Sequence, residues 1–99
     1  MHTYYFWDNA KRQSNLEKHG LDFIDADLVL ENRYRLDVPS ERNGEARIQS
    51  FAYVFEVLTV LTVVFLPGEQ GVRIISFRRA NRTEKEVYYA WLQDNGDDG

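Results

Sequence analysis

The spacing of hydrophobic and polar residues changes several times along the chain, and each change predicts a different element. Residues 4–7 are aromatic and predict a short strand. A polar stretch follows, in which Asp8 is placed as a helix N-cap and Gly20 as the left-handed residue that ends the helix. Behind a second cap at Asp22, apolar residues recur at helical spacing over residues 23–31. The first third of the chain is therefore predicted to hold one strand and two helices.

From residue 34 onward the pattern becomes that of a sheet. Residues 34–38 predict a strand and residues 39–44 a turn, while residues 46–66 are β-branched and aromatic without Gly or Pro. Fully extended, this last run would span roughly 70 Å, whereas a domain of this size has a radius of gyration near ~13 Å. The run must therefore double back, and we place the reversal at residues 55–58.

The last third of the chain completes an α+β pattern. Residues 67–71 predict a loop, residues 72–77 a strand, and residues 81–93 a helix. The expected architecture is an antiparallel β-sheet with two N-terminal helices and one C-terminal helix. We assign residues 1–94 to a single domain and residues 95–99 to an acidic, disordered tail.

Composition excludes several classes of protein. The chain has 99 residues, of which 43% are hydrophobic, so it can bury a core of its own. It has no cysteine, which excludes disulfides and thiolate metal sites and fits a cytoplasmic location. Its two histidines do not have the spacing of metal ligands, so we expect neither metal nor cofactor. The longest apolar run is shorter than a membrane helix needs and contains Glu56, which argues against a membrane protein.

Positive charge is concentrated near the C-terminal end of an acidic chain. The formal net charge is −4, yet residues 67–85 hold five Lys/Arg against two Glu. Four of these cations are arginines: Arg73, Arg78, Arg79 and Arg82. Such a local excess predicts an anion site, and nucleic acid is the polymeric anion most often bound in this way.

Arg78 and Arg79 are the strongest candidates for that site. They follow directly on a predicted strand whose side chains alternate, so one can face a cleft while the other turns to the far side. The planar guanidinium group binds phosphate oxygens in pairs. The alternative is a pair of surface charges bonded to Glu84 or Glu86.

Two further sets of polar residues have both a structural and a functional interpretation. Lys11, Asn15 and Lys18 or His19 share one face of the first helix, which is equally typical of a solvated face. In the last helix, Asn81 and Glu84 form a capping-box pattern. We therefore favour a capping role for Glu84 over a catalytic one. Tyr88 lies one turn beyond Glu84 on the same face, and a tyrosine at the edge of that stripe could keep its hydroxyl in contact with water.

Two segments carry a resemblance to a known family. They are Phe6-Trp7-Asp8-x-x-Lys11-x-x-x-Asn15-x-x-Lys18-His19-Gly20-x-x-Phe23 and Arg73-Ile74-Ile75-Ser76-x-Arg78-Arg79-Ala80-x-x-x-Glu84-x-x-x-Tyr88. Together they resemble the BrnT family of bacterial type II toxins, which are ribonucleases similar in fold to the RelE toxins. The likeness covers nearly the whole chain.

The resemblance implies a RelE-like, cytoplasmic, metal-independent endoribonuclease that cleaves RNA and inhibits translation. It also implies neutralisation by a BrnA-like antitoxin with a ribbon-helix-helix domain, through which alone the toxin reaches operator DNA. The assembly would be a homodimer or a heterotetramer with the antitoxin. Carried over by position, the catalytic candidates are Arg78 and Arg79 first, then Lys11, His19, Glu84 and Tyr88. The concentration of positive charge adds Arg73 and Arg82 as candidates for binding RNA phosphates.

The sequence also departs from the family pattern. Family members usually carry an arginine where this chain has Phe65-Leu66-Pro67-Gly68, and glycines where it has residues 54–58. One cation fewer in the site predicts weaker activity. A second interpretation is therefore a non-catalytic, degenerate toxin that serves as an antitoxin-binding module or co-repressor. A plain nucleic-acid-binding domain is a third, which the negative net charge disfavours.

Overall fold

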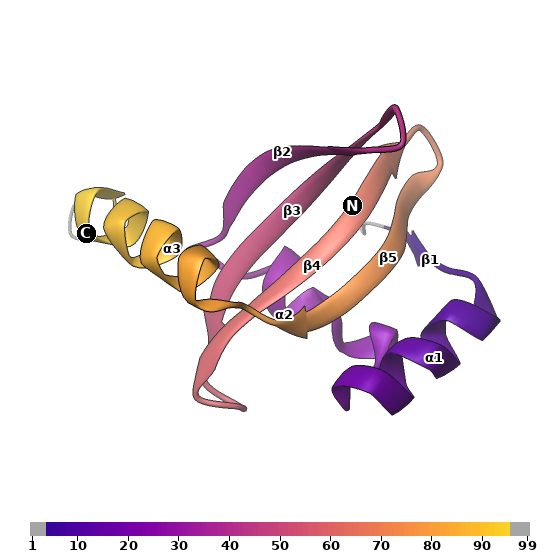
Figure 1. The fold of residues 1–99 in the computed structure, drawn as a ribbon, viewed down its shortest axis with the longest axis horizontal. Helices are drawn as coiled ribbons and strands as arrows, with labels where there is room; N and C mark the ends of the chain where they lie inside the picture. The colour runs from indigo at the N-terminus through magenta and orange to yellow at the C-terminus, as the bar shows by residue number, and fades with distance from the viewer. Residues whose placement is uncertain (1–3, 96–99) are drawn as a thin grey trace.

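The fold is built on one five-stranded sheet, with residues 4–95 described by a computed structural model. In chain order the elements are β1 (Tyr5–Phe6), α1 (Asn9–His19), the 3-10 helix η1 (Phe23–Asp25), α2 (Asp27–Leu30), β2 (Leu36–Arg42), β3 (Glu45–Val54), β4 (Thr59–Gly68), β5 (Gly71–Arg79) and α3 (Arg82–Asn95) (Figure 1). The strand order is β1-β5-β4-β3-β2, and only the β1–β5 pair is parallel among these strands. The α+β fold expected from the sequence is confirmed.

The N-terminal helices begin and end at the predicted caps. The Asp8 carboxylate accepts hydrogen bonds from the backbone N–H groups of Ala10 and Lys11, and Gly20 ends α1 with a φ of 69°. The second predicted helix is divided into η1 and α2. Asp25 and Ala26 donate to carbonyls three residues earlier, so the first turn is of the 3-10 type, and bonds to a carbonyl four residues earlier begin only at Leu30.

The prediction of a turn over residues 39–44 is wrong in its first part. Residues 39–42 belong to β2, and the turn consists of Asn43 and Gly44 alone, with φ values of 53° and 79°. Positive φ at both central residues is what a two-residue type I′ hairpin requires, and Asn-Gly satisfies it. Pro39 is tolerated within a strand because β2 lies at the edge of the sheet.

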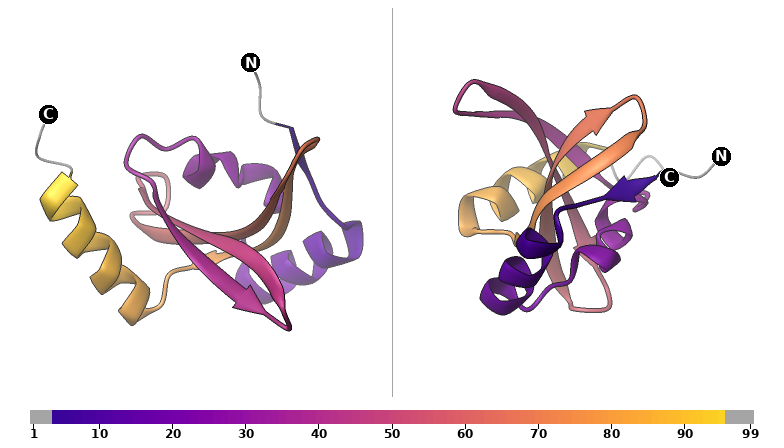
Figure 2. Two further views of the ribbon diagram at one scale, coloured as in Figure 1. Left: turned by 90° about the horizontal axis from the view of Figure 1, so that it is seen from above. Right: turned by 90° about the vertical axis from the view of Figure 1, so that its right-hand side faces the viewer.

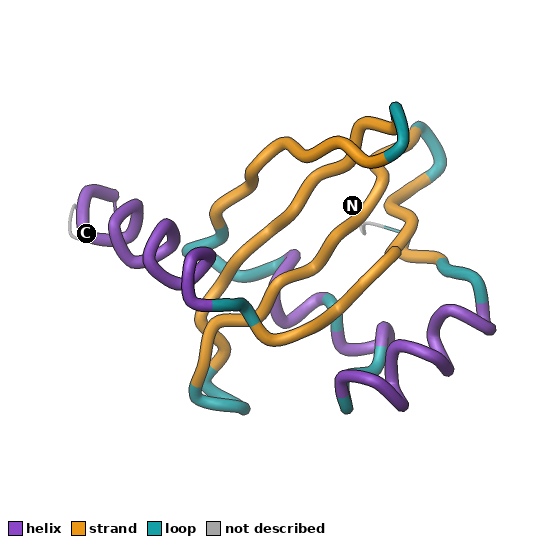
Figure 3. The backbone as a smooth tube through the Cα atoms, viewed as in Figure 1, coloured by secondary structure: helices purple, strands orange, loops and turns teal. Residues whose placement is uncertain are grey.

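The other strand boundaries follow the prediction with shifts. The chain reverses at residues 55–58 as expected, where the Leu58 N–H donates to the Val54 carbonyl at 2.8 Å. The loop predicted over residues 67–71 shrinks to two residues, Glu69 and Gln70, because both strands run further than expected. Figure 3 shows the resulting run of long strands joined by short turns. Of the tail predicted at residues 95–99, Asn95 belongs to α3 and the rest lies outside the described residues.

The two faces of the sheet are covered unequally. On one face, η1 and α2 pack against the sheet, where Phe23, Val29 and Phe77 are fully buried (Figure 2). On the other face, α3 covers one end only, through Tyr88 packed with Phe51 and their neighbours. We call this second side the open face, since beyond α3 no described helix lies over it.

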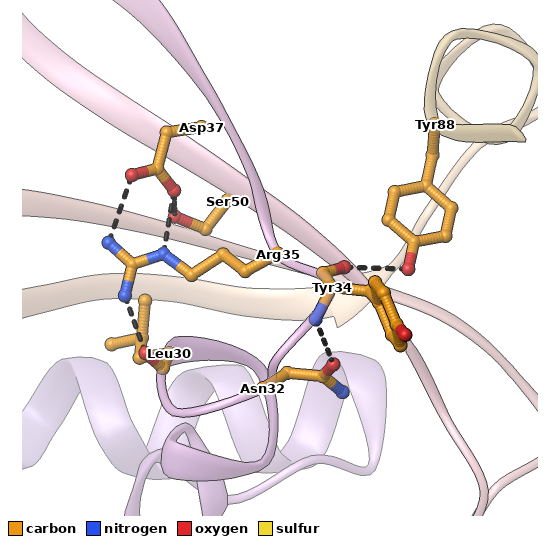
Figure 4. A network of polar contacts seen from close by, with 7 residues as sticks. All are labelled: Leu30, Asn32, Tyr34, Arg35, Asp37, Ser50 and Tyr88. Atoms are coloured by element: carbon orange, nitrogen blue, oxygen red, sulfur yellow. Dashed lines mark hydrogen bonds and ion pairs between the residues drawn. The ribbon is translucent and has the colours of Figure 1, made fainter. Parts of the chain in front are cut away.

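A polar network fixes the segment between α2 and β2 and attaches α3 to it (Figure 4). The Tyr34 N–H donates to the Asn32 side chain at 2.9 Å, and the Tyr34 carbonyl accepts the Tyr88 hydroxyl at 2.7 Å. Arg35, the next residue, pairs with Asp37 at 2.7 Å. Through this bond the buried Tyr88 attaches α3 to the segment between α2 and β2.

Candidate functional site

A hollow of about 530 Å³ opens on the open face between α1 and the β2–β3 hairpin. Lys11 of α1, Arg78 and Ser76 of β5, and Arg47 of β3 are among the residues that line it. A shallower hollow of about 250 Å³ continues it along α1 and shares Lys11 and Ser76 with the first. We call the two together the basic groove.

The lining of the basic groove is strongly cationic. Its Lys and Arg side chains are Lys11, Lys18, Arg42, Arg47 and Arg78, and Glu41 is the one carboxylate among the residues that line it. This excess of positive charge stands in a chain whose net charge is −4. Clefts lined by one sign of charge raise the local concentration of ions of the opposite sign.

Arg78 reaches the basic groove from the last strand. It pairs with Thr62 in the β4–β5 ladder, which places its side chain on the open face. Its two terminal nitrogens donate to the two carboxylate oxygens of Glu84 at 2.7 and 2.9 Å. This bidentate bond raises the pKa of Arg78 above its ordinary value and holds the guanidinium group in one orientation.

Glu84 is held from three sides. It forms the predicted capping box with Asn81, accepting the Asn81 N–H at 2.9 Å while its own N–H donates to the Asn81 side chain at 2.8 Å. The Thr62 hydroxyl donates to the same carboxylate at 3.3 Å. Burial acts to raise the pKa of Glu84, but the bonds from Arg78, Asn81 and Thr62 outweigh it, so the pKa is lowered. A carboxylate bound in this way is a poor proton acceptor and is well placed to orient Arg78.

His19 enters the basic groove from the end of α1. Partial burial, followed by the positive charges of Lys18 and Arg78, lowers the pKa of His19 below its usual value of 6.5. The imidazole is therefore neutral at pH 7 and can accept a proton. Lys11, near the start of α1, lines both hollows.

The four arginines of the C-terminal segment do not gather at one site. Arg79 pairs with Leu61, whose side chain is buried on the helix-covered face, so Arg79 leaves β5 on the side opposite to Arg78. Arg73 is exposed near the start of β5, and Arg82 is 94% exposed on α3, where it pairs with Glu86 at 3.3 Å. Neither Arg73 nor Arg82 lines the basic groove.

The expectation of a water-exposed Tyr88 is wrong. Tyr88 is 1% exposed, because α3 packs its ring against the sheet and its hydroxyl donates to Tyr34. Burial raises the pKa of Tyr88. Of the predicted site residues, the structure brings together Lys11, His19 and Arg78, with Glu84 behind Arg78; Arg73, Arg79, Arg82 and Tyr88 lie elsewhere.

Sequence reasoning missed the contribution of the β2–β3 hairpin to the groove. Arg42 and Arg47 line the larger hollow together with Gln49. The dipeptide Asn43-Gly44 was the available signal, because it is the strongest short-range indication of a two-residue hairpin. With that turn in place, Arg42 and Arg47 lie diagonally across the paired strands, opposite Glu45 and Ser40 respectively.

The described residues hold no group of metal ligands and no helix that could span a membrane. Across residues 4–95, His, Asp and Glu side chains form no group of three or more placed to hold a metal ion. No helix within this described part of the chain has the length and apolar character to cross a membrane.

The geometry defines a small α+β protein with a groove lined by Lys and Arg side chains on the open face of its sheet. A sequence profile of the ribonuclease toxin BrnT, of type II toxin-antitoxin systems, matches residues 7–84, and the chain belongs to this family. The protein is thus a ribonuclease toxin, whose substrate is RNA and whose partner is an antitoxin. No curated protein sequence matches the chain.

Proposed function

We propose that the protein is a metal-independent endoribonuclease that inhibits translation, and that cleavage takes place in the basic groove. One observation carries the proposal: His19 and Arg78, whose guanidinium group is fixed by Glu84, line the two adjoining hollows of the groove. Burial, and then the charges of Lys18 and Arg78, lower the pKa of His19. A base and a phosphate-binding cation are the minimum that RNA cleavage without a metal requires.

The reaction begins with attack of a ribose 2′-hydroxyl on the adjacent phosphorus. Neutral His19 accepts the hydroxyl proton, the new P–O bond closes a 2′,3′-cyclic phosphate, and the bond to the 5′-oxygen breaks. The Lys11 ammonium group gives a proton to that leaving oxygen. Negative charge grows on the phosphoryl oxygens in the transition state, where the Arg78 guanidinium stabilises it; one such donor is typically worth ~3 kcal/mol.

The remaining candidates receive other roles or none. Glu84 orients Arg78 through the bidentate bond and does not act as the base, because its pKa is lowered and its oxygens are occupied. Arg79 faces the opposite side of the sheet, and Tyr88 is buried under α3. The proposal gives neither of them a step in the reaction, and places Arg73 and Arg82 outside the groove.

The proposal extends to partners. A BrnA-like antitoxin with a ribbon-helix-helix domain neutralises the toxin in the cytoplasm, and the complex reaches operator DNA only through that domain. A heterotetramer with the antitoxin fits this arrangement. Support for these points is the family membership of the chain.

The experiment compares Arg78→Gln with Arg79→Gln in cleavage of a fluorogenic RNA. We expect kcat/KM to fall about a hundredfold in Arg78→Gln, by loss of ~3 kcal/mol of transition-state stabilisation, and to fall much less in Arg79→Gln. The wild-type activity should survive EDTA and leave a cyclic phosphate. Equal losses in the two variants, activity that requires a divalent metal, or a 5′-phosphate product would contradict the mechanism.

Growth measurements separate the toxin from the degenerate alternative. Induced expression without an antitoxin should arrest growth, and Arg78→Gln should relieve the arrest. If the wild-type protein binds an antitoxin but neither arrests growth nor cleaves RNA, the non-catalytic interpretation is correct.

A further inference from the structure

The wall of the basic groove that faces Lys11 and Arg78 is formed by the β2–β3 hairpin. Five polar residues of this wall line the larger hollow: Ser40, Glu41, Arg42, Arg47 and Gln49. Ser40 is paired directly with Arg47 in the ladder, so the two side chains leave the sheet on the same face. Nothing in the proposed chemistry at Arg78 uses these groups.

The hairpin holds its two arginines in a defined place. The Asn43-Gly44 turn closes the strands tightly, and the residues that flank it, Arg42 and Glu45, are still paired. Arg47 donates one hydrogen bond from Nε to Oε1 of Glu45 at 3.0 Å, its Nη2 forms an ion pair with the same oxygen at 2.9 Å, and its side chain is 19% exposed. A guanidinium group has five N–H donors, so Arg47 keeps donors free for a ligand while it is fixed by Glu45.

Arg42 forms no ion pair among the described residues, because the carboxylate of Glu45, its partner in the β2–β3 ladder, contacts Arg47 instead. Among the residues that line the groove, Glu41 is the one carboxylate beside five Lys/Arg. Like charges that converge on one hollow repel each other, and an anion in the hollow removes that repulsion.

The hairpin cations lie at the far end of the larger hollow from Arg78. Arg78 is opposite Thr62, and Thr62 is opposite Phe51, so Arg47 starts two strands away and four residues further along β3, roughly 16 Å from Arg78. Arg42, which is opposite Glu45, starts further away still. A strand of RNA can contact both ends of the hollow at once, because it presents successive phosphates along its backbone.

We propose that Arg42 and Arg47 form a second phosphate subsite, in which the β2–β3 hairpin binds the RNA backbone at a nucleotide away from the cleaved bond. The inference rests on the proposed function in that it takes the groove as the RNA site. It adds a substrate requirement: a dinucleotide fills the Arg78 end only, whereas a longer RNA also engages the hairpin and binds more tightly.

The test measures binding and cleavage separately. Binding of a non-cleavable 2′-O-methyl RNA of about eight nucleotides, a length within the range of single-strand binding sites, is followed by fluorescence anisotropy at several salt concentrations. The variant is Arg42→Gln, and the matched control is Arg33→Gln, an exposed arginine outside the groove that loses the same charge.

We expect Arg42→Gln to weaken binding of the longer RNA about tenfold and to flatten the dependence of log K on log salt by ~0.7, the value for one lost phosphate contact on a single strand. Cleavage of a dinucleotide should be unchanged. Arg47→Lys keeps the charge but loses the planar guanidinium group, so it should weaken binding less than Arg47→Gln does. Thermal melting shows whether each variant is folded.

Two results would overturn the subsite. One is an Arg42→Gln affinity no lower than that of Arg33→Gln; the other is an equal loss of cleavage for the dinucleotide and the longer RNA. The outcome is independent of the chemistry, because a wild-type protein that binds RNA with the expected salt dependence but fails to cleave would refute the nuclease mechanism and leave the subsite standing.

Discussion

The side-chain amide of Asn15 takes the place of a neighbouring strand beside Phe77. Its nitrogen donates to the Phe77 carbonyl at 2.8 Å, and the Phe77 N–H donates to its oxygen at 3.1 Å. The pairing of β1 with β5 ends at Arg73, so this part of the β5 edge has no strand partner among the described elements. Buried backbone groups without a partner are costly, and Asn15, at 8% exposure, supplies both bonds.

This contact sets the position of α1 against the sheet. The same amide nitrogen also donates to the Leu21 carbonyl at 3.0 Å, so it joins α1 to β5 and to the segment that follows α1. Lys11 and His19 lie on α1, and their placement relative to Arg78 depends on this junction.

Asn15→Ala should therefore destabilise the protein and misplace the groove. Loss of three hydrogen bonds, at roughly 1 kcal/mol net each, predicts a decrease of about 3 kcal/mol in the free energy of unfolding. Urea denaturation measures it, and Gln13→Ala, on the exposed side of the same helix, should change it by less than about 0.5 kcal/mol. If the two variants unfold alike, the strand-like role of Asn15 is wrong.

The bond between Arg78 and Glu84 makes stability depend on pH in a predictable direction. The folded-state pKa of Glu84 is lowered from 4.5, so the carboxylate contributes stability that is fully present above pH 4.5 and is lost as the pH falls through the folded value. Glu84→Gln keeps an acceptor for the Asn81 N–H but removes the charge. We expect a loss of about 2 kcal/mol at pH 7 that shrinks below pH 4.5.

The matched control for this prediction is Glu86→Gln. Glu86 pairs with Arg82 across one helical turn, but the two side chains are 68% and 94% exposed. Exposed pairs of this kind contribute little, so its effect should stay under about 0.5 kcal/mol at either pH. A deficit in Glu84→Gln that does not vary with pH would show that the charge of Glu84 plays no part.

The elements of the fold were predictable where a local signal decides them. Asp8, Gly20 and the Asn81/Glu84 box mark helix ends by bonds within one turn, and all three form. The β3–β4 reversal has no Gly or Pro, and only chain length located it. Its Leu58 adopts a left-handed φ of 56°, which propensity alone disfavours for leucine.

The site was harder to predict because neighbours in sequence diverge in space. Alternation along β5 correctly predicts that the side chains of Arg78 and Arg79 lie on opposite faces of the sheet. It does not predict which residues form the opposite wall of the groove. The facing wall comes from Arg42 and Arg47, about thirty residues earlier in the chain, and depends on a register that the hairpin sets. The exposure of Tyr88 was predicted wrongly, because the spacing of apolar residues along a helix does not show which edge of its apolar face packs against the core.

The pKa of His19 should respond to its cationic neighbours. Burial lowers it first, and the charges of Lys18 and Arg78 lower it further, because a second positive charge on the imidazole is disfavoured beside them. Lys18→Gln should therefore raise the pKa of His19 toward 6.5, measured by NMR titration of the imidazole. Lys85→Gln, which removes the same charge from α3, should leave it in place.

The same variant connects titration to activity. If His19 is the base, the activity of the wild-type enzyme falls on the acid side with the pKa of His19, and Lys18→Gln moves that limb to higher pH by the shift that NMR reports. If the NMR pKa of His19 shifts in Lys18→Gln but the acid limb of the pH–activity profile does not, His19 is not the base.

Gly71 allows β1 to join the sheet. A Cβ atom at this position would lie 2.3 Å from the Tyr4 carbonyl oxygen, which accepts the Val72 N–H at 2.8 Å, and the φ of 146° is one that other residues rarely adopt. Gly71→Ala must displace the backbone of residue 4 and break this bond. We expect a loss of at least about 2 kcal/mol and faster hydrogen exchange at Val72.

Gly44→Ala separates the clash from the conformational strain. Gly44 also has a positive φ, 79°, but an added Cβ would meet no atom within 4 Å, so only strain of about 1 kcal/mol applies. The excess loss in Gly71→Ala then measures the contact with Tyr4. If Gly71→Ala and Gly44→Ala lower the free energy of unfolding equally, and hydrogen exchange at Val72 is unchanged, then pairing of β1 with β5 does not require glycine at position 71.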